Sequence, residues 1–323
     1  MRIKNFFIIL LGGISIVWIY NFFAGPESIT YIVAHKEKLL LLVLAHIPTL
    51  FLDTLAWKIL MRKNYLGLLW CFLITWISQT AGKITPTGAI TGEFVRIYLS
   101  IKKGMTTSEA SSTVIGDLAL AAFSLLIMAL VSFLFLFYNS ENLNVFQGKV
   151  RYLTFSIVIL IFATVGFCIS IRKRFMKSFL RKFPRIIKLN KEIINNLIKF
   201  DFELFRLSFR LKIVFLALFY RTLGWIGGAF EIYVFFLIIG VSVDFTDVII
   251  IESITGIIRA IVFFIPAGLG VQEISFVIVG NFLGLASPVS FSAAIGRRIR
   301  EILVGVPALI TWYKLFSNKK RIN

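Results

Sequence analysis

Cysteine and histidine are scarce in this chain of 323 residues. Cys71 and Cys168 are the two cysteines, and both lie inside apolar runs, which supports neither a disulfide framework nor a thiolate metal site. His35 falls in a loop, and His46 precedes Asp53 by seven residues in an apolar stretch, which is a poor metal spacing. Both histidines are interpreted as satisfied or solvated residues, and the sequence predicts no metal and no other cofactor.

The motifs of common enzymes are also missing. The chain holds no G-x-S-x-G, H-E-x-x-H or P-loop pattern, so hydrolase, metalloprotease and nucleotide-driven machinery are unsupported. Acidic residues are few, 16 against 35 Lys and Arg, which gives a net charge of +19. In a chain this apolar, basic loops mark the cytoplasmic side of a membrane and its anionic lipid, so we predict no nucleic-acid partner.

Apolar residues, in contrast, are abundant. They fill 58% of the positions, Phe alone supplies 34, and the mean hydropathy is +0.89, which is typical of a polytopic membrane protein. A chain crosses the hydrocarbon as a helix of roughly 20 apolar residues, because unpaired backbone groups are costly in lipid. The predicted fold class is therefore all-α, in a single membrane domain over residues 1–323.

Six segments are predicted to cross the membrane fully: residues 6–23, 39–57, 112–138, 152–171, 213–240 and 289–316. The first lacks a small-x-small cleavage site and is read as a retained helix. Residues 172–212, a predicted amphipathic surface segment, hold thirteen Lys and Arg against three acids. The positive-inside rule places this segment and both termini in the cytoplasm.

A polar stretch, TPTGAITGEFVR at residues 85–96, interrupts the apolar pattern. If residues 66–81 formed a complete span, the basic segment 172–212 would lie outside the cell. All loops agree with the positive-inside rule if residues 66–81 enter the membrane, break at GKITPTG and return through residues 91–101. Each arm is shorter than a span, and proline with glycine explains the break. The sequence thus predicts a re-entrant helical hairpin.

A second polar break, PAGLGVQE at residues 266–273, lies between the apolar arms 248–265 and 274–285 and predicts a second re-entrant hairpin. With their flanking spans, the hairpins define two units, residues 39–138 and 213–316, of similar length and opposite orientation. Glu93 follows Pro86 by seven residues, and Glu273 follows Pro266 by seven. This spacing indicates an inverted repeat of the kind that many transporters contain.

Ionisable residues inside the apolar segments are the candidate functional residues, because a charge at the bilayer centre costs roughly 3 kcal/mol or more and needs a partner, a water cavity or a function. Twelve such residues occur: Glu93, Arg96, Asp117, Arg221, Glu231, Glu252, Arg259, Glu273, Arg297, Arg298, Arg300 and Glu301. One interpretation is that part of this set forms structural ion pairs, since Glu301 lies at helical spacing from Arg297 and Arg298.

The other interpretation is a translocation site. If the two hairpin tips meet at mid-membrane, Glu93, Arg96, Glu273 and the arginine cluster gather around one cavity, which is where transporters place their sites. The guanidinium groups of Arg96 and Arg297, with free backbone N–H groups at the tips, suit phosphate or another anionic headgroup. The two glutamates suit proton uptake or a positive headgroup.

The sequences PTGAITGEFVRIYLSIKKG, ASSTVIGDLAL, FFIPAGLGVQEISFVIVG and RRIREILVGVPAL resemble the flippase-like family defined by the membrane region of lysylphosphatidylglycerol synthases. The GVQE sequence and the R-x-R-E-x-L-x-G-x-P spacing resemble most its branch associated with hopanoid biosynthesis. The resemblance spans nearly the whole chain. Twelve residues fall on the family's characteristic positions: Pro86, Gly88, Gly92, Glu93, Arg96, Asp117, Pro266, Gly268, Gly270, Glu273, Arg298 and Glu301. Ala89 departs from the family pattern, which often has a second glycine there.

This resemblance implies a protein of the bacterial inner membrane that moves a lipid, a hopanoid or another polar lipid, between leaflets. Membrane lipids and hopanoid-biosynthesis proteins are the partners that it implies. The aminoacyl-transferring domain of the synthases is a separate unit that nothing in this chain matches, so synthase activity is not expected. Two alternatives stay open: an intramembrane lipid-modifying enzyme with Glu93 or Glu273 as general base, and a non-catalytic scaffold that recruits enzymes through residues 172–212.

Overall fold

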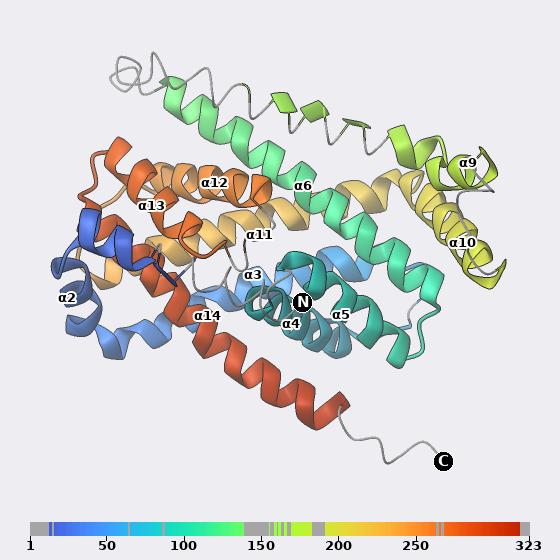
Figure 1. Cartoon of the computed structure of the whole chain (residues 1–323), viewed down its shortest axis with the longest axis horizontal. Coiled ribbons are helices and arrows are strands. Elements are labelled where there is room, and N and C mark those ends of the chain that lie inside the picture. Colours follow the sequence, from blue (N-terminus) through green and yellow to red (C-terminus); the bar gives the residue numbers. More distant parts are fainter. Residues whose placement is uncertain are drawn as a thin grey trace.

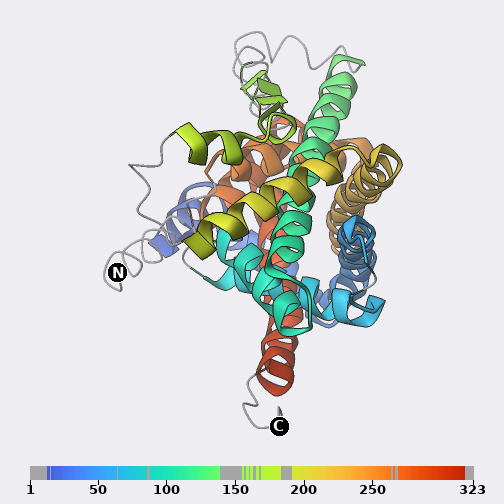
Figure 2. The same ribbon diagram turned by 90° about the vertical axis from the view of Figure 1, so that its right-hand side faces the viewer.

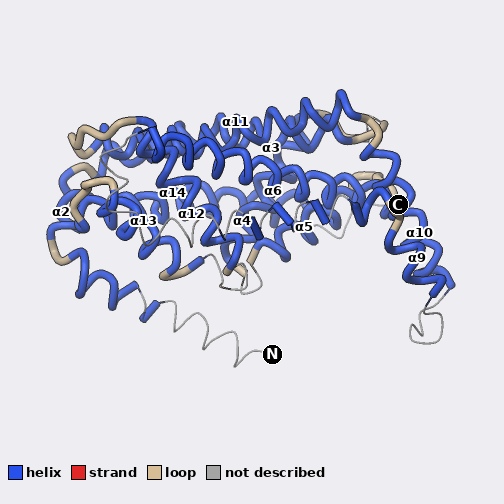
Figure 3. Tube along the Cα trace, turned by 90° about the horizontal axis from the view of Figure 1, so that it is seen from above, coloured by secondary structure: helices blue, strands red, loops and turns tan. Residues whose placement is uncertain are grey.

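A computed structural model describes residues 13–316, apart from residues 15, 64, 86–87, 139–154, 156–157, 160, 163–164, 167–168, 183–190, 263–264 and 266–267. The described part is helical and contains no strand, which confirms the predicted all-α class (Figures 1 and 3). Its helices are η1 (Tyr20–Ala24), α2 (Glu27–Ala34), η2 (Lys36–Leu39), α3 (Leu40–Leu60), α4 (Leu68–Ile84), α5 (Ala89–Lys102), α6 (Thr107–Tyr138), α9 (Phe175–Lys182), α10 (Lys191–Ser208), α11 (Leu211–Ile238), α12 (Phe245–Ile261), α13 (Val271–Phe282) and α14 (Ser287–Phe316).

Three of the described helices are long and apolar enough to cross a bilayer: Lys36–Leu60, Thr107–Leu136 and Leu211–Ile238. They correspond to three of the six predicted spans. Helix α14 is 30 residues long, but the charged side chains of residues 297–301 interrupt its apolar surface. The predicted spans 6–23 and 152–171 extend beyond the described residues, as does Cys168, whereas Cys71 is buried in the core.

Helices α3 and α11 form the central pair of the bundle, and they run antiparallel, because Thr49 and then Asp53 of α3 meet Gly227 and then Gly224 of α11. Gly227 packs against Thr49, so closely that an added Cβ would lie 2.6 Å from the threonine Oγ1. One turn away on each helix, Gly224 packs against Asp53, where a Cβ would lie 2.9 Å from Oδ1. Small residues let two helix backbones approach in this way, and the glycines of α11 therefore set the spacing of the pair.

The helices on either side of this pair repeat the same packing pattern. Helix α4 packs on α5 and α3, as α12 packs on α13 and α11. Helix α6 contacts α5, α11 and α12, as α14 contacts α13, α3 and α4. The units 39–138 and 213–316 thus have equivalent contacts, with α3, α4, α5 and α6 matching α11, α12, α13 and α14 in that order.

The polar break at residues 85–88 separates α4 from α5. Thr85 has an extended backbone, as expected before proline, and Gly88 has a φ of +58°, a conformation that favours glycine. The two helices fold back on each other. They pack so closely that a Cβ added at Gly92 of α5 would lie 2.7 Å from the carbonyl oxygen of Ser78 in α4. The predicted helical arms are therefore present as a tightly packed hairpin.

The second break separates α12, which ends at Ile261, from α13, which begins at Val271. Gly270 precedes α13 with a φ of +78°, and its N–H donates to Glu273 Oε2 at 2.8 Å. This contact satisfies one of the free N–H groups at the start of the helix. Helices α12 and α13 pack on each other as the second hairpin.

The basic segment 172–212 contains two helices, α9 and α10, with residues 183–190 between them outside the described part. Helix α10 lies across α6, as Figure 2 shows. Its residues Leu204 and Leu207 are buried, whereas Lys199 is exposed. The predicted amphipathic character of this segment is therefore seen in α10, whose apolar face covers α6.

Candidate functional site

Charged side chains from eight helices meet inside the bundle and form two groups. The first, here called the α6 network, lies around Asp117 and contains six polar side chains: Asp53, Gln79, Glu93, Arg96, Asp117 and Arg221. The second, here called the α14 hub, lies around residues 297–301 and contains His46, Lys83, Glu231, Glu252, Arg259, Gln272, Glu273, Arg297, Arg298, Arg300 and Glu301.

Asp117 of α6 is the centre of the first network, and its side chain is fully buried. Its Oδ2 accepts a hydrogen bond from Arg96 Nη1 at 2.6 Å and another from Arg221 Nη2. Its Oδ1 accepts a bond from Arg221 Nε at 2.9 Å, so that Arg221 holds the carboxylate at both oxygens. One buried carboxylate thereby ties α5 and α11 to α6.

A second carboxylate, Asp53 of α3, extends the α6 network. Its Oδ1 accepts a bond from Arg221 Nη1 at 2.7 Å, and its Oδ2 accepts one from Gln79 Nε2 at 2.8 Å. The guanidinium group of Arg96 also lies 5.4 Å from the ring centroid of Trp57, within cation–π range. The network therefore connects α3, α4, α5, α6 and α11.

Glu93 is the least constrained acid of the α6 network. Its Oε2 lies 3.5 Å from Arg96 Nη1, one turn along α5. This oxygen is buried, yet it accepts no hydrogen bond from the described residues. Because Arg96 donates its short bond to Asp117 instead, Glu93 keeps an acceptor with only a loose electrostatic partner.

Three arginines of α14 each bind a carboxylate on a different helix. Arg297 binds both oxygens of Glu252 on α12, with Nη2 to Oε1 at 2.9 Å. Arg298 donates through Nε to Glu273 on α13 at 2.6 Å, and Arg300 donates through Nε to Glu231 on α11 at 2.7 Å. Three arginines within four positions of α14 thus hold three neighbouring helices by charge-assisted hydrogen bonds.

Both polar breaks are attached to the α14 hub. Lys83, next to the end of α4, lies 3.5 Å from Oε1 of Glu301. Arg298 donates to Glu301 Oε2 at 3.1 Å and to the carbonyl oxygen of Gly268 at 3.1 Å. Glu273 links Arg298 to the start of α13 through Gly270. The hub therefore joins the residues beside the first break to those of the second.

His46 is part of the hub as a hydrogen-bonding partner. Its Nδ1 lies 3.0 Å from Oε2 of Glu231, whose Oε1 accepts bonds from Arg300. Within the described part of the chain, no three His, Cys, Asp or Glu side chains are grouped as metal ligands. His46 is therefore interpreted as a hydrogen-bonding partner of the buried Glu231 carboxylate.

Hydrogen-bond donors outnumber acceptors at the hub. Buried Nε of Arg297, Nη1 of Arg300 and Nε2 of Gln272 donate no hydrogen bond to the described residues. Arg259 forms no ion pair with a described carboxylate, and its Nη1 donates to the amide oxygen of Gln272 at 3.2 Å. Buried polar groups are normally paired, so this surplus of donors is complementary to an anionic group or to water.

Of the candidate residues predicted from sequence, Pro86 and Pro266 lie outside the described part, and all the others are described. Glu93, Arg96 and Asp117 lie in the α6 network, whereas Glu273, Arg297, Arg298 and Glu301 lie in the α14 hub. The predicted single cluster is thus divided between two groups. Gly88, Gly92, Gly268 and Gly270 shape the hairpins.

The structure adds polar residues that sequence analysis did not place in the site. Asp53 and His46 were weighed only as a metal pair, but their seven-residue spacing puts both on the face of α3 that meets α11. Lys83 was read as part of a break, and Gln272 carries no charge that marks it in an apolar segment. A polar residue one or two positions from a predicted break is the signal that identifies these last two.

Comparison with known proteins identifies the family. The model of the lysylphosphatidylglycerol synthase transmembrane region matches residues 8–308, so the chain belongs to this family. The family match and the apolar helices together identify the chain as a multi-pass membrane protein related to lipid handling. No curated protein and no solved structure matches the chain significantly.

Proposed function

We propose that this member of the family moves a polar lipid between the leaflets of the bacterial inner membrane. The headgroup is sheltered at the α14 hub while the acyl or polycyclic tail stays in the bilayer. Hopanoid lipids are the first substrates to test, because the sequence resembles the hopanoid-associated branch. Another polar lipid with an anionic headgroup is equally compatible with the chemistry of the hub.

The surplus of donors at the hub is the observation that carries this proposal. Arg297, Arg300 and Gln272 each keep a buried N–H group that donates no hydrogen bond to the described residues, and Arg259 forms no ion pair with a described carboxylate. A phosphate or carboxylate headgroup supplies several acceptor oxygens at once, and guanidinium groups bind such oxygens with good geometry. A lipid headgroup passing the hub therefore exchanges water for these donors.

The proposed membrane topology has six full spans, two re-entrant hairpins and cytoplasmic termini. Two features support it. The α4–α5 and α12–α13 hairpins have arms of 12 to 17 residues, shorter than the roughly 20 of a span. The antiparallel α3 and α11, with equivalent contacts in each unit, are the arrangement of an inverted repeat, in which transporters bind substrate between the two halves.

The test is a leaflet-sidedness assay in proteoliposomes. Labelled hopanoid, phosphatidylglycerol and aminoacylated lipid are incorporated, and the fraction accessible to a membrane-impermeant reagent is followed with time. Faster exchange of one of these lipids than in protein-free vesicles supports translocation. Equal exchange for all three lipids argues against an autonomous translocator.

An intramembrane lipid-modifying enzyme is the second candidate, because Glu93 retains a buried carboxylate oxygen without a hydrogen-bond donor. Such a group is suited to accept a proton from a substrate hydroxyl. Mass spectrometry of the lipids recovered from the same vesicles separates the two functions. An unchanged set of lipid masses accompanies translocation, whereas a new mass that disappears with Glu93→Gln identifies the enzyme.

A further inference from the structure

A separate cavity with an apolar part and a basic part lies where α10 crosses α6. Its apolar part, of about 380 Å³, is lined by residues of α6, α10 and α11, by Leu60 at the end of α3, and by Val165, Ile169, Ile171 and Arg172. This volume falls within the roughly 300–1,000 Å³ that is typical of sites for small molecules. Ala119, Phe123 and Phe215 are among its lining residues.

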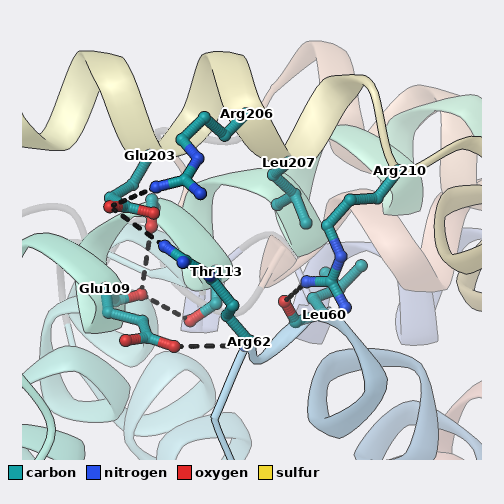
Figure 4. Close-up of a pocket in the computed structure, with 9 residues that line it drawn as sticks. Leu60, Arg62, Glu109, Thr113, Glu203, Arg206, Leu207 and Arg210 are labelled. Atoms are coloured by element: carbon teal, nitrogen blue, oxygen red, sulfur yellow. Dashed lines mark hydrogen bonds and ion pairs between the residues drawn. The ribbon is translucent and has the colours of Figure 1, made fainter.

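A smaller, basic pocket of about 200 Å³ adjoins it, at the junction of α3, α6 and α10 (Figure 4). Three arginines line this pocket, Arg62, Arg206 and Arg210, together with two acids, Glu109 and Glu203. The arginines therefore outnumber the carboxylates at this end of the cavity.

The ion pairs in the basic pocket are loose. Arg62 Nη1 and Arg206 Nη1 lie 4.0 and 3.8 Å from Glu203 Oε1, and these three side chains are between 28% and 51% exposed. Glu109 Oε1 instead accepts backbone N–H bonds from Arg62 at 3.1 Å and from Lys63 at 3.4 Å. The guanidinium groups of Arg62 and Arg206 thus remain open to a stronger acceptor than Glu203.

The two spaces share a wall. Leu60 and Leu207 line both the apolar cavity and the basic pocket, and Arg210 Nη1 donates to the carbonyl oxygen of Leu60 at 3.0 Å beside that wall. An apolar chamber that continues into a cationic one matches a molecule with a hydrocarbon chain and an anionic head. A membrane lipid has this chemistry.

We propose that a phospholipid with an anionic headgroup occupies this composite cavity. One acyl chain fills the apolar part, and the phosphate lies beside Arg62 and Arg206. The site is distinct from the α6 network and the α14 hub, none of whose residues line either space. The proposal therefore does not depend on the proposed translocation, and it assigns α10 the role of holding a resident lipid.

Binding to the purified full-length chain tests this proposal. Native mass spectrometry measures the uptake of phosphatidylglycerol, phosphatidylcholine and glycerol 3-phosphate, the last presenting the phosphate without a tail. We expect the wild-type chain to retain phosphatidylglycerol in preference to the other two. Equal retention of phosphatidylcholine contradicts the anionic headgroup, and equal binding of glycerol 3-phosphate shows a phosphate site that needs no lipid tail.

Three variants make the test specific. The double variant Arg62→Gln with Arg206→Gln should weaken phosphatidylglycerol binding by about 25-fold, since each basic group near an anionic headgroup contributes about fivefold. Ala119→Phe fills the apolar part and should reduce the binding of both phospholipids. Lys199→Gln removes an exposed charge from the same helix, outside the cavity, and should leave binding unchanged.

These variants also provide the outcomes that overturn the proposal. Phosphatidylglycerol binding that survives the double arginine variant or Ala119→Phe excludes the cavity as its site. A loss with Lys199→Gln equal to that with Arg206→Gln shows that general surface charge, not the cavity, attracts the lipid. Because Arg206 and Lys199 are both exposed on α10, these two single variants are expected to fold, and their melting temperatures check this.

Discussion

Arg96 donates through Nη1 to Oδ2 of Asp117 at 2.6 Å, and both side chains are almost completely shielded, with 4% and 0% of their surfaces exposed. Burying two charges is costly unless each is paired and its remaining hydrogen-bonding atoms are satisfied. Here Arg221 satisfies the second face of the carboxylate, and Ser78 Oγ accepts from Arg96 Nε at 3.3 Å. The contact therefore fixes how α5 lies against α6.

Removing the charge of Asp117 should destabilise the protein strongly. Asp117→Asn leaves Arg96 with only the loose contact to Glu93 and Arg221 with Asp53 alone, and breaking a buried pair costs about 3–5 kcal/mol. Thermal unfolding in detergent measures the effect. Asp244→Asn is the matched control, because Asp244 is exposed and makes no side-chain cap hydrogen bond. Similar melting temperatures for the two variants would contradict this role of Asp117.

Gly92 should be needed for stability because of the close packing of α5 on α4, since its backbone has no positive φ. A Cβ there lies 2.7 Å from the Ser78 carbonyl oxygen, and a backbone atom cannot yield as a flexible side chain does. Gly92→Ala is expected to lower the free energy of unfolding by roughly 1–3 kcal/mol. Gly13→Ala is the control, since nothing lies within 4 Å of its added Cβ. If Gly92→Ala is as stable as the control, the close contact of α4 with α5 is wrong.

The pair of Arg297 and Glu252 distinguishes structural charges from functional ones. Either single change, Arg297→Met or Glu252→Met, leaves one buried charge uncompensated and should cost about 3–5 kcal/mol. The double variant removes both charges, and its stability should return close to that of the wild type. A double-mutant cycle of unfolding measures this coupling. Additive losses would show that the two side chains do not depend on each other.

The double variant also separates stability from transport. Its fold is expected to be intact, but the hub has lost the donors of Arg297, including the Nε that makes no hydrogen bond to the described residues. Slower lipid exchange by this well-folded variant is the expected result. Wild-type exchange would mean that this arginine serves the fold and not the headgroup.

Much of the fold could be predicted from sequence because its signals are local. The long apolar run of α6 after Asp117 and the proline and glycine residues around Gly88 define helices and breaks without reference to the rest of the chain. Side-chain pairing could not be predicted in the same way. Arg297 lies one turn from Glu301 but pairs with Glu252 on α12, because the direction of its side chain depends on which helix packs against α14.

In the candidate site, too, the residues could be predicted from sequence but their partners could not. Glu93 and Glu273 occupy equivalent positions in the two sequence repeats and are expected to share one cavity if the two hairpin tips meet, yet they lie in different groups of ion pairs. The packing of the two long helices explains this. Glu273 pairs with Arg298 of α14, whereas Arg96, the partner of Glu93, pairs with Asp117 of α6. Sequence spacing identified the polar residues, and the packing of α6 and α14 decided how they are divided.

Arg259 allows the most direct test of the central claim, that donors at the α14 hub receive a lipid headgroup. It forms no ion pair with a described carboxylate, so Arg259→Gln should fold normally, with Lys38→Gln as an exposed control on η2. The measurement is the initial rate of lipid exchange between leaflets in proteoliposomes with equal amounts of each protein. We predict a rate at least about fivefold slower for Arg259→Gln, as expected for one lost contact of roughly 1 kcal/mol, and a wild-type rate for the control. Equal rates for both variants and the wild type would contradict the account.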